Sequence, residues 1–486
     1  MKKIITITLS VIYLTTNGQN ELDALRFSQD LGLFGSARSA AIGNAFGALG
    51  GDFSSLSNNP AGIGLYQFNE FTFTPAFGLN STVSYATNRI EGNNRNINIG
   101  NLGIVYSLNK KSSDWKRINI GIGWNQLASY DKNIWIYSEN SNSSLADRIL
   151  DEAQGNSIDE LDQLYAGPAF WSDLIDLADN SIDTTLDVPW YLFDNGNYIS
   201  HIKSDSKKLQ EKHLISNGGK GEFVFSFGGS YNERIYLGAT VSTPNIDYYE
   251  KSIYTENMLE DTINNLESFN WEEELSVYGE GVNLKLGMIM RLSDQIKIGT
   301  SLHSPTVFTI EETYSTKWTT KFNDGRNQEV SPYNYHQYEL ITPWKASISA
   351  STTYKKMLLI SGQYEIIDYA FTEMSSNSHD FRVENTAIKD LYKRSNNIMI
   401  GAEVNIKPLI IRSGYAQYGS PYINNDFSRE NYSFGIGINN GNFFFDAAYV
   451  LSQGNNSHRL YSEDYVEPIS LKETEHNLIF TLGLRY

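Results

Sequence analysis

Apolar and polar residues alternate along most of the chain, from residue 68 to the C-terminus. In the segments 71–79, 282–292 and 478–486, every second residue is mostly large and apolar, and the residues between them are mainly small, polar or charged. A period of two residues is typical of β-strands with one apolar and one polar face. This pattern predicts about fourteen strands, at 68–85, 96–108, 117–130, 220–231, 234–256, 271–292, 295–315, 338–354, 357–371, 394–406, 409–420, 429–440, 442–453 and 473–486.

The connections between these strands alternate in length. Tight links fall at Asn232-Glu233, Ser293-Asp294, Lys355-Lys356, Lys407-Pro408 and Asn440-Gly441. The Asn-Gly pair favours a type I′ turn. The other links are longer, and the longest covers residues 131–219. Short periplasmic turns and long external loops are typical of transmembrane β-barrels, which places Tyr486 at the periplasmic end.

A closed barrel lets such strands cross a bilayer. Backbone N–H and C=O groups in hydrocarbon must pair with one another, so the sheet can have no free edge. The face rich in Phe, Leu and Ile then points to lipid, and the face rich in Gly, Ser and Asn lines the lumen. Candidates for the interfacial aromatic girdles are Trp124, Tyr130, Trp344, Tyr354, Tyr449 and Tyr486. Core packing in a soluble sheet is the alternative, and it does not explain the Gly- and Ser-rich faces. We therefore predict an all-β fold, a transmembrane antiparallel barrel over 68–486.

The N-terminus has the pattern of a secretory signal. Lys2 and Lys3 precede an apolar run over 4–14, and small or polar residues follow before Gln19. We predict that residues 1–18 are a cleaved signal peptide. A buried first strand is the alternative, but these features occur together in the order of a signal. No later run approaches the length of a membrane helix. An exported chain must then cross a membrane with strands, which indicates the outer membrane of a Gram-negative bacterium.

Composition excludes several kinds of chemistry. The chain of 486 residues has no cysteine, which rules out disulfides, thiolate metal sites and cysteine nucleophiles. Its 38 basic and 56 acidic residues give a formal charge of −18, which disfavours nucleic-acid binding. The histidines are scattered, and no metal, nucleotide or hydrolase motif is present. We therefore expect no metal, no cofactor and no enzyme activity. A haem ligand at His303 is conceivable, but an isolated histidine is more often structural.

The segment between the signal and the first strand is rich in small residues. Residues 31–52 are mostly Gly, Ala and Ser with scattered apolar residues. Such a segment is too rich in small residues to build its own core and too apolar to be a free linker. We predict that residues 19–67 form a hatch that packs inside the lumen. The segment contains the run Asn59, Pro60, Ala61 and Gly62.

This segment resembles the hatch of the FadL/TodX family of outer-membrane transporters for hydrophobic compounds. Members of that family plug a fourteen-stranded barrel with a hatch that contains an Asn-Pro-Ala element, which Asn59-Pro60-Ala61 matches. Weaker matches follow in order at 125–127, 169–175, 302–306, 342–345, 364–369 and 401–403. The resemblance implies passive transport of a hydrophobic compound.

The third predicted strand contains an irregularity. Its alternation breaks at Asn125 and Gln126, after which Leu127 has the wrong parity, as a β-bulge would produce. Gly121 and Gly123 add backbone freedom. FadL-like proteins have a kink in this strand that opens a lateral gap. The resemblance therefore implies that Gly121, Gly123, Asn125 and Gln126 mark a lateral exit into the bilayer.

Two segments share one sequence pattern. Residues 235–244 and 296–305 each have Gly at the fourth position and Pro at the tenth. Both follow a predicted tight turn, so the two prolines should lie at the same depth. We expect them towards the outer rim, where a missing N–H costs least.

Charged residues on the polar face predict a network in the lumen. Pairing the strands across Lys407-Pro408 sets Glu403 opposite Arg412. Glu365 and Lys345 could extend this pair into a larger network. We favour a structural role in which the network holds the hatch to the wall. Recognition of a ligand carboxylate is the alternative.

Within the long loop, apolar residues recur at helical spacing over 145–178. They predict short amphipathic helices that cap the barrel. Phe170, Trp171, Leu174 and Ile175 are candidates for a groove that collects ligand. Packing of the helices on one another has equal weight. The acidic faces could bind divalent cations shared with anionic surface lipid.

We predict an outer-membrane channel for passive uptake of hydrophobic small molecules, either long-chain fatty acid-like or aromatic, with lateral exit through the wall. The alternative is a barrel that does not transport and binds proteins, similar to PorV-type secretion components. The expected partners are a hydrophobic ligand, outer-membrane lipid and lipopolysaccharide. The barrel assembly machinery should recognise the C-terminal strand, which ends at Tyr486.

Overall fold

The computed structural model describes residues 21–30, 35–109, 114–140, 142–178, 196–202, 206–260, 262, 265–325, 327–462 and 464–486. The predicted signal peptide, residues 1–18, lies outside this part of the chain. None of the described helices is long and apolar enough to span a bilayer.

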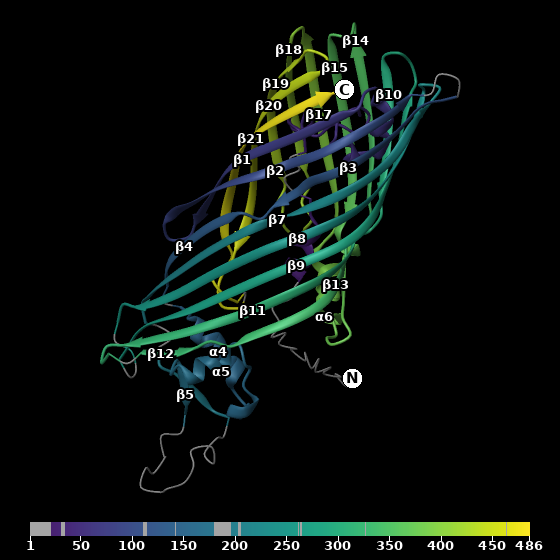
Figure 1. Cartoon of the computed structure of the whole chain (residues 1–486). Coiled ribbons are helices and arrows are strands. Elements are labelled where there is room, and N and C mark those ends of the chain that lie inside the picture. The colour runs from purple at the N-terminus through teal and green to yellow at the C-terminus, as the bar shows by residue number, and fades with distance from the viewer. Residues whose placement is uncertain are drawn as a thin grey trace, which may run out of the picture.

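One antiparallel sheet closes on itself to form a barrel (Figure 1). It closes because β1 pairs with β21 along its whole length, from Glu70 opposite Arg485 to Tyr85 opposite Ser470. The fourteen positions around the described barrel are β1 (Glu70–Tyr85), β2 (Arg89–Asn109), β3 (Trp115–Ser129), β7 (Lys208–Tyr231), β8 (Ile235–Met258), β9 (Leu266–Arg291), β10 (Ile296–His303), β14 (Lys345–Tyr354), β15 (Leu358–Asp368), β17 (Arg394–Ile406), β18 (Leu409–Tyr418), β19 (Arg429–Asn439), β20 (Phe443–His458) and β21 (Ile469–Arg485). The predicted antiparallel barrel of about fourteen strands is confirmed.

Three of these positions are built from two segments each. Beyond a short interruption, the three positions continue as β4 (Lys132–Asn140) after β3, β11 (Val307–Phe322) after β10, and β13 (Tyr333–Ile341) before β14. The short strands β12 (Asn327–Val330) and β16 (Glu373–Ser375) pair with β11 and β13. The barrel wall is therefore longer at these positions than the sequence pattern suggested.

Tight turns and long loops lie at opposite ends of the barrel. The turns and the C-terminus occupy one end, and the longest loops with helices α4 (Leu145–Ala153) and α5 (Ala166–Trp171) occupy the other (Figure 1). Asn232 with Glu233 and Lys355 with Lys356 have positive φ at both turn residues, as a type I′ turn requires. The type I′ prediction for Asn440-Gly441 is wrong, because only Gly441 has positive φ there. The Asn440 side chain instead accepts a hydrogen bond from the Phe443 N–H at 2.9 Å.

The predicted loop over 131–219 is shorter in the structure. Strand β4 and the first half of β7 pair with each other and extend the wall over 132–140 and 208–216. The described loop between them contains α4 (Leu145–Ala153), the 3-10 helix η2 (Ile158–Glu160), α5 (Ala166–Trp171), β5 (Ile175–Leu177) and β6 (Tyr198–Ser200). Asp131 and Gly218 interrupt the two-residue alternation. The sequence pattern therefore does not show that the wall continues beyond them.

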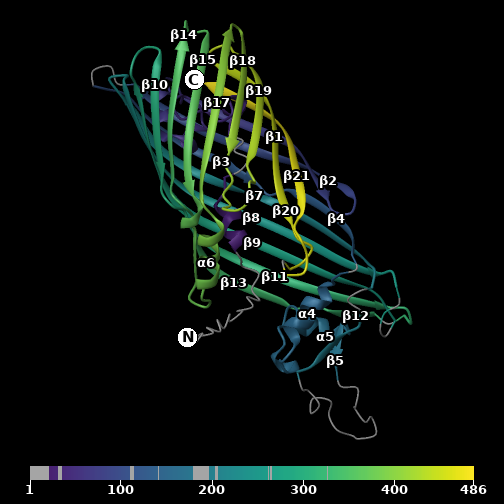
Figure 2. The ribbon, with the colours of Figure 1, turned by 180° about the vertical axis from the view of Figure 1, so that it is seen from behind.

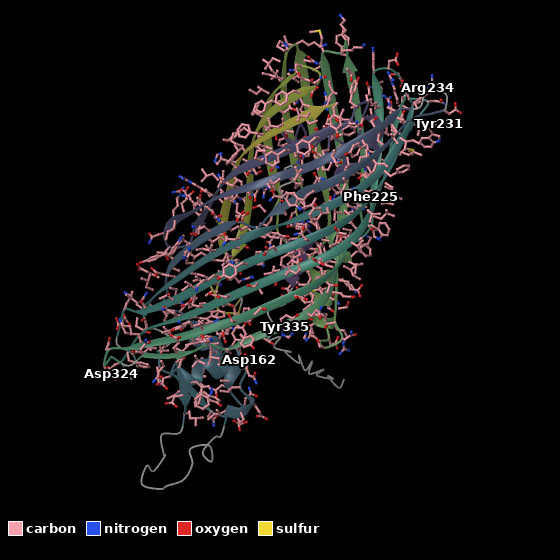
Figure 3. The ribbon with its side chains drawn as sticks, viewed as in Figure 1. Asp162, Phe225, Tyr231, Arg234, Asp324 and Tyr335 are labelled. Atoms are coloured by element: carbon pink, nitrogen blue, oxygen red, sulfur yellow. The ribbon has the colours of Figure 1, made fainter. Side chains whose placement is uncertain are left out.

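The outer face of the barrel is apolar near the turn end. Phe223, Phe225 and Phe227 point outward from β7, and Phe225 is 55% exposed (Figure 3). Farther towards the loops, the outward residues of β8 include Asp247 and Lys251 instead. A closed barrel with an apolar outer band is the arrangement that a bilayer requires.

One of the predicted girdle residues faces the other way. Trp344, Tyr354 and Tyr486 are exposed. Tyr130 is only 7% exposed and packs edge to face against Phe27 of the hatch and Tyr248 of β8. Its assignment to a girdle is therefore wrong, because the break between β3 and β4 turns its ring into the lumen.

The N-terminal segment fills the lumen. It consists of α1 (Glu21–Ser28), α2 (Ala37–Ala41), α3 (Ser55–Asn58) and the 3-10 helix η1 (Pro60–Leu65). Helix α2 contacts β18 to β21, whereas η1 contacts β3 and β7 to β9. These strands form opposite sides of the barrel, and the purple segment lies between them in Figure 2. At the loop end, η5 (Tyr369–Phe371) and α6 (Arg382–Leu391) pack near α1.

The two prolines of the repeated pattern do not lie at the outer rim. Pro305 falls between β10 and β11, and Pro244 falls inside β8, which continues to Met258. The rim prediction is wrong because β8 and β11 extend far beyond these residues.

Candidate functional site

The hatch motif is fixed by the side chain of Asn59. Its amide nitrogen donates to the carbonyl of Gly47 at 2.6 Å, and its amide oxygen accepts from the Ala61 N–H at 3.1 Å. Asn59 thus caps η1, and Pro60 takes the first helical position, where a missing N–H costs nothing. His303 of the wall lies 3.0 Å from the carbonyl of neighbouring Asn58, which favours its structural interpretation.

Glycines of the wall make room for this motif. Gly238 lies opposite Gly228 on β7 and Gly287 on β9. A Cβ atom on Gly238 would lie 2.1 Å from the Pro60 carbonyl oxygen, and one on Gly287 would lie 2.0 Å from the Asn59 amide oxygen. Gly299 is the glycine at the same position of the second repeated segment, and the hatch backbone comes close to it as well. There a Cβ on Gly299 would lie 2.3 Å from the Gly47 carbonyl oxygen.

Replacing Gly238 by alanine is expected to lower the free energy of unfolding by about 1–3 kcal/mol, because the added methyl group meets backbone of the hatch. Urea titration of the barrel in lipid vesicles measures the change. Gly362→Ala is the matched control, since the only neighbour of its Cβ would be the Met399 carbonyl oxygen at 3.9 Å. Equal stability of the two variants would contradict a tight hatch contact at Gly238.

One charge network ties α2 to the wall. Glu403 and Arg412 lie opposite each other on β17 and β18. The Arg412 guanidinium donates to Glu403 at 2.7 Å and to Asp446 at 2.6 Å. Arg38 of the hatch donates to the same Glu403 oxygen at 3.1 Å. The network therefore connects the hatch with three wall strands, the arrangement that a structural role requires.

Lys345 and Glu365 belong to a separate network, so their predicted link to Arg412 is wrong. The Lys345 ammonium group donates to Asp30 of the hatch at 2.8 Å and lies 4.0 Å from Glu365. The second oxygen of Asp30 lies 2.6 Å from the Lys220 ammonium group. The two networks separate because each is organised by a different hatch residue, Arg38 or Asp30, which strand pairing alone does not reveal.

Lys220 also holds the end of α1. Its ammonium group donates to the carbonyls of Phe27 at 3.0 Å and Gln29 at 2.7 Å, where the negative end of the helix dipole lies. Burial raises the pKa of Asp30, but the ammonium groups of Lys220 and Lys345 outweigh burial and hold that pKa well below its usual range. Asp30 is thus a charged clasp for the N-terminal segment.

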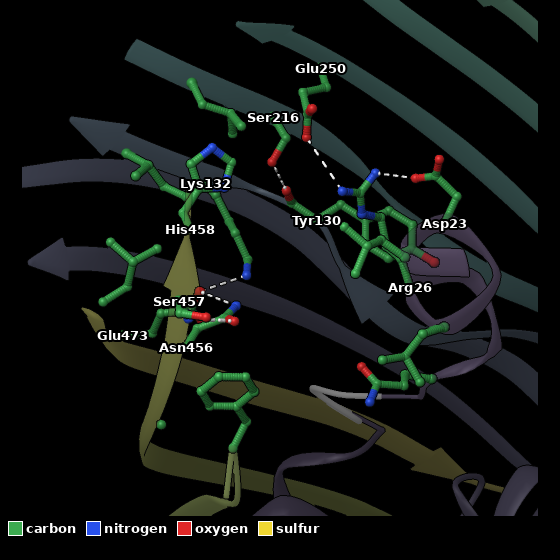
Figure 4. Close-up of a pocket in the computed structure, with 18 of the residues that line it drawn as sticks. Asp23, Arg26, Tyr130, Lys132, Ser216, Glu250, Asn456, Ser457, His458 and Glu473 are labelled. Carbon is green, nitrogen blue, oxygen red and sulfur yellow. Dashed lines mark hydrogen bonds and ion pairs between the residues drawn. The ribbon is translucent and has the colours of Figure 1, made fainter. Parts of the chain in front are cut away.

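A cavity of about 420 Å³ lies in the lumen on the loop side of this clasp (Figure 4). Helix α1 forms one side of it, and strands from both halves of the barrel form the rest. Its apolar lining comprises Leu22, Leu25, Ala128, Ile134, Leu214, Leu275, Pro421, Phe427 and Leu471. Its volume is in the range of small-molecule sites.

Charged pairs divide the apolar surface of this cavity. Arg26 and Asp23 are 2.6 Å apart, and Lys132 and Glu473 are 2.7 Å apart (Figure 4). Sequence reasoning missed the cavity, because its walls come from nine strands at eight positions of the barrel, from loop residues and from the hatch. The inward-facing charges at the loop ends of long strands were its only sequence signal.

The wall has an unpaired seam beside β3. The ladder between β2 and β3 ends at Asn101 opposite Asn125, and the register of β3 shifts between Gln126 and Ala128. Strand β4 then pairs with β7, and within the described residues no ladder joins it to residues 89–100 of β2. The irregularity thus coincides with the bulge that the sequence pattern indicates around Leu127.

The four residues proposed for the lateral exit have different surroundings. Gly121 and Gly123 lie in the regular part of the ladder with β2. Their Cβ atoms would lie 2.7 Å from Leu56 and 2.5 Å from Phe53, so they admit the hatch. Asn125 donates to the hydroxyl of Ser57 at 2.6 Å, so it ends the ladder and also holds the hatch. Gln126 lies at the bulge itself. The glycine positions therefore do not open the wall.

Side chains hold the seam together. Asn96 donates to the Asp131 carboxylate at 2.7 Å, and Ser129 donates to the same oxygen at 2.6 Å. Farther along, Asn133 donates to the Asn93 carbonyl at 3.0 Å. A second cavity of about 410 Å³ opens here, lined by Asn96, Trp124, Gln126 and Asp131 among others. Side-chain hydrogen bonds of this kind can break, and the two edges of the seam can then separate without breaking a strand ladder.

The predicted loop groove is not formed. Leu174 and Ile175 are 0% and 1% exposed in a cluster that also contains Trp271 and Trp318. Ile175 lies in β5 rather than in a helix. Phe170 packs against this cluster, and Trp171 is exposed. These side chains are thus packed into a core that the loop shares with the barrel wall, and they leave no open groove. No group of three or more metal-ligating side chains occurs in the described residues.

The fold and the hatch define the class of this protein, a fourteen-stranded β-barrel that its own N-terminal segment plugs. The chain has the fold of the FadL/TodX channels, as its sequence resemblance predicts. The P. putida toluene transporter TodX matches with a TM-score of 0.53 and 11% identity, over 93% of this chain and 98% of that one. A Pseudomonas aeruginosa FadL homologue matches with a TM-score of 0.55 and 10% identity, over 91% and 95%.

The monoaromatic hydrocarbon channel CymD matches with a TM-score of 0.52 and 10% identity, over 93% of this chain and 97% of that one. No family model and no curated protein matches the sequence. At these identities the likeness shows the fold, and the function has to be argued from the residues of this chain.

Proposed function

We propose that this chain is an outer-membrane channel for the passive uptake of a small molecule with a hydrophobic part, and that the solute leaves sideways through the seam beside β3. The observation that carries the proposal is the position of the two cavities. Ala128, Ser129, Tyr130 and Lys132 line the cavity in the lumen, and Asp131 in the same segment lines the cavity at the seam. One short stretch of wall thus separates the two spaces.

The hatch supports a lateral route. The buried hatch residues Phe53, Leu56 and Ile63 pack against β2, β3 and β7 and close the lumen towards the turn end. A solute in the cavity therefore meets a packed plug along the axis and a side-chain seam at the wall. The structures with the same fold include a toluene transporter and a monoaromatic hydrocarbon channel, which supports transport of a hydrophobic compound.

Cross-linking the seam is expected to slow uptake several-fold. The chain has no cysteine, so Asn96→Cys with Asp131→Cys supplies two unique thiols for a short bifunctional reagent that a reductant cleaves. Entry of the hydrophobic dye N-phenylnaphthylamine into cells that produce the protein measures uptake. Cleavage of the cross-link should restore the rate.

The control pair is Tyr106→Cys with Ile120→Cys, which lie opposite each other in the paired part of β2 and β3. Its cross-link should not alter uptake. Equal rates before and after seam cross-linking would contradict lateral exit. Dye entry that does not depend on the protein would favour the alternative role as a protein-binding platform.

The outer face of the barrel indicates how the protein would lie in the membrane. The apolar outer band near the turn end would lie in the outer membrane, and the polar ends of β8 and β9 would project towards surface lipopolysaccharide. Exposed Tyr486 directly follows β21, the strand that closes the barrel with β1, and we propose this position for contact with the barrel assembly machinery.

A further inference from the structure

The lumen cavity has more acidic than basic lining residues. The five acidic side chains are Asp23, Glu250, Glu273, Glu473 and Glu475. The three basic ones are Arg26, Lys132 and Arg429. The low effective dielectric inside a protein strengthens the interaction of a ligand charge with this lining. The net charge of the lining residues therefore influences which ligand head group the cavity accepts.

The basic groups are already engaged. Arg429 lies 2.5 Å from Glu475, and Lys132 lies 2.7 Å from Glu473. Arg26 lies between Asp23 at 2.6 Å and Glu250 at 3.6 Å (Figure 4). A carboxylate ligand would have to break one of these pairs and leave an unpaired acidic group in its place, which is costly.

One acidic group has no such partner. Within the described residues, no cation lies within 4.0 Å of the Glu273 carboxylate, which accepts a hydrogen bond from the Tyr314 hydroxyl at 2.6 Å. The ammonium group of Lys212 and the guanidinium group of Arg148 lie farther away and act on this carboxylate without an ion-pair contact. The Tyr314 hydroxyl lies 3.0 Å from that of Tyr165. All three residues line the cavity. A ligand cation would meet a carboxylate that needs no exchange of partners.

Aromatic rings add to the preference for a cation. The aromatic lining residues are Tyr130, Tyr165, Tyr248, Tyr314, Tyr422 and Phe427. Two of these rings already carry guanidinium groups of the protein, because Arg26 lies 4.6 Å above Tyr248 and Arg148 lies 5.3 Å above Tyr165. Ring faces attract ammonium groups by the same interaction.

An unsatisfied polar group points to a ligand. The Tyr130 side chain is 7% exposed, and its hydroxyl has no hydrogen-bond partner among the described residues. Buried hydroxyls are usually bonded, so this one calls for an explanation. A ligand in the cavity would supply a partner or a contact for it.

From the excess of carboxylates, the Glu273 carboxylate that forms no ion pair within 4.0 Å among the described residues, and the aromatic lining, we infer that the cavity selects an amphiphile with an ammonium head group over one with a carboxylate. The leucine side chains of the cavity would hold the hydrocarbon tail. This inference rests on the proposed function and narrows its substrate class away from fatty acids.

Calorimetric titration of the barrel in lipid nanodiscs tests the inference with three ligands of equal chain length: octyltrimethylammonium, octanoate and octanol. Titration of empty nanodiscs corrects for partition into lipid. We expect the ammonium ligand to bind at least tenfold more tightly than octanoate and several-fold more tightly than octanol. Glu273→Gln should reduce the preference for the ammonium ligand several-fold.

Glu274→Gln is the matched control, because Glu274 is the next residue on β9 and points outward to Lys251 at 2.9 Å. It should leave the preference unchanged. If octanoate or octanol binds as tightly as the ammonium ligand, or if Glu273→Gln preserves the ratio, the inference is overturned and the proposed function stands. If none of the three ligands binds, both are overturned.

Discussion

Replacing Arg412 by methionine is expected to lower the free energy of unfolding of the barrel by about 3–5 kcal/mol. The substitution keeps the length of the side chain and removes its charge. Asp446 is 4% exposed and would lose the cation that lies 2.6 Å away. Glu403 would keep only Arg38 of the hatch. Urea titration in lipid vesicles, followed by tryptophan fluorescence, measures the loss.

Two further variants test whether this loss of stability comes from the buried charges. Arg382→Met makes the same change on α6, where the side chain is exposed and its pair with Asp380 should matter little. Arg412→Met combined with Asp446→Asn removes the uncompensated charge and should regain part of the stability. A stability of Arg412→Met within 1 kcal/mol of the parent protein would contradict a buried network that holds hatch and wall together.

Replacing Asp30 by asparagine is expected to release α1 from its site. The change leaves Lys220 and Lys345 buried near each other without the carboxylate that lies 2.6 and 2.8 Å from them. Removing one partner of such a buried cluster costs about 3–5 kcal/mol. Hydrogen–deuterium exchange over 21–30 should therefore become much faster, whereas exchange in the barrel strands should change little.

The response to pH follows from the same clasp. The folded-state pKa of Asp30 is held below its usual range by the two lysines, so its stabilising contribution is present at neutral pH and is lost only as the pH falls through that lowered value. Protection of residues 21–30, corrected for intrinsic exchange, should then be the same at pH 5 and pH 7. Asp380→Asn, on an exposed pair, is the control. Unchanged exchange in Asp30→Asn would contradict the clasp.

The two networks have a common consequence for the proposed transport. Arg412 fixes α2 to the wall, and Asp30 fixes the end of α1, which forms one side of the lumen cavity. Both would have to break before the whole hatch could leave the barrel. The seam between β2 and β4 needs only side-chain hydrogen bonds to separate, such as the one between Asn96 and Asp131. This difference favours a sideways route over removal of the plug.

Features that depend on local backbone geometry could be predicted from the sequence. The alternation at 282–292 appears in the structure as a strand with Leu284 and Leu286 outside and Lys285 inside. The change of parity at Leu127 appears as a shift of register between Gln126 and Ala128. Both follow from the two-residue period of a pleated strand, which needs no knowledge of the neighbours.

Features that depend on contact between distant segments could not be predicted in this way. Tyr130 carries the same alternation signal as a girdle aromatic, yet the break before β4 turns it inward. Lys345 faces the lumen as expected, but its partner is Asp30 of the hatch rather than the Arg412 network. Gly121 and Gly123 are glycines because Leu56 and Phe53 come close to them.

The sequence by itself determined that this chain forms an antiparallel barrel with an apolar outer band, short turns at one end and a small-residue segment to fill the lumen. Periodicity, local composition and the lengths of the links are local properties, so they can be read from neighbouring residues. Only the tertiary structure decided where the wall is left unpaired, which lysines hold Asp30 and which side chains surround the lumen cavity. Those features arise where the hatch contacts many strands at once, and strand periodicity carries no information about contacts between distant segments.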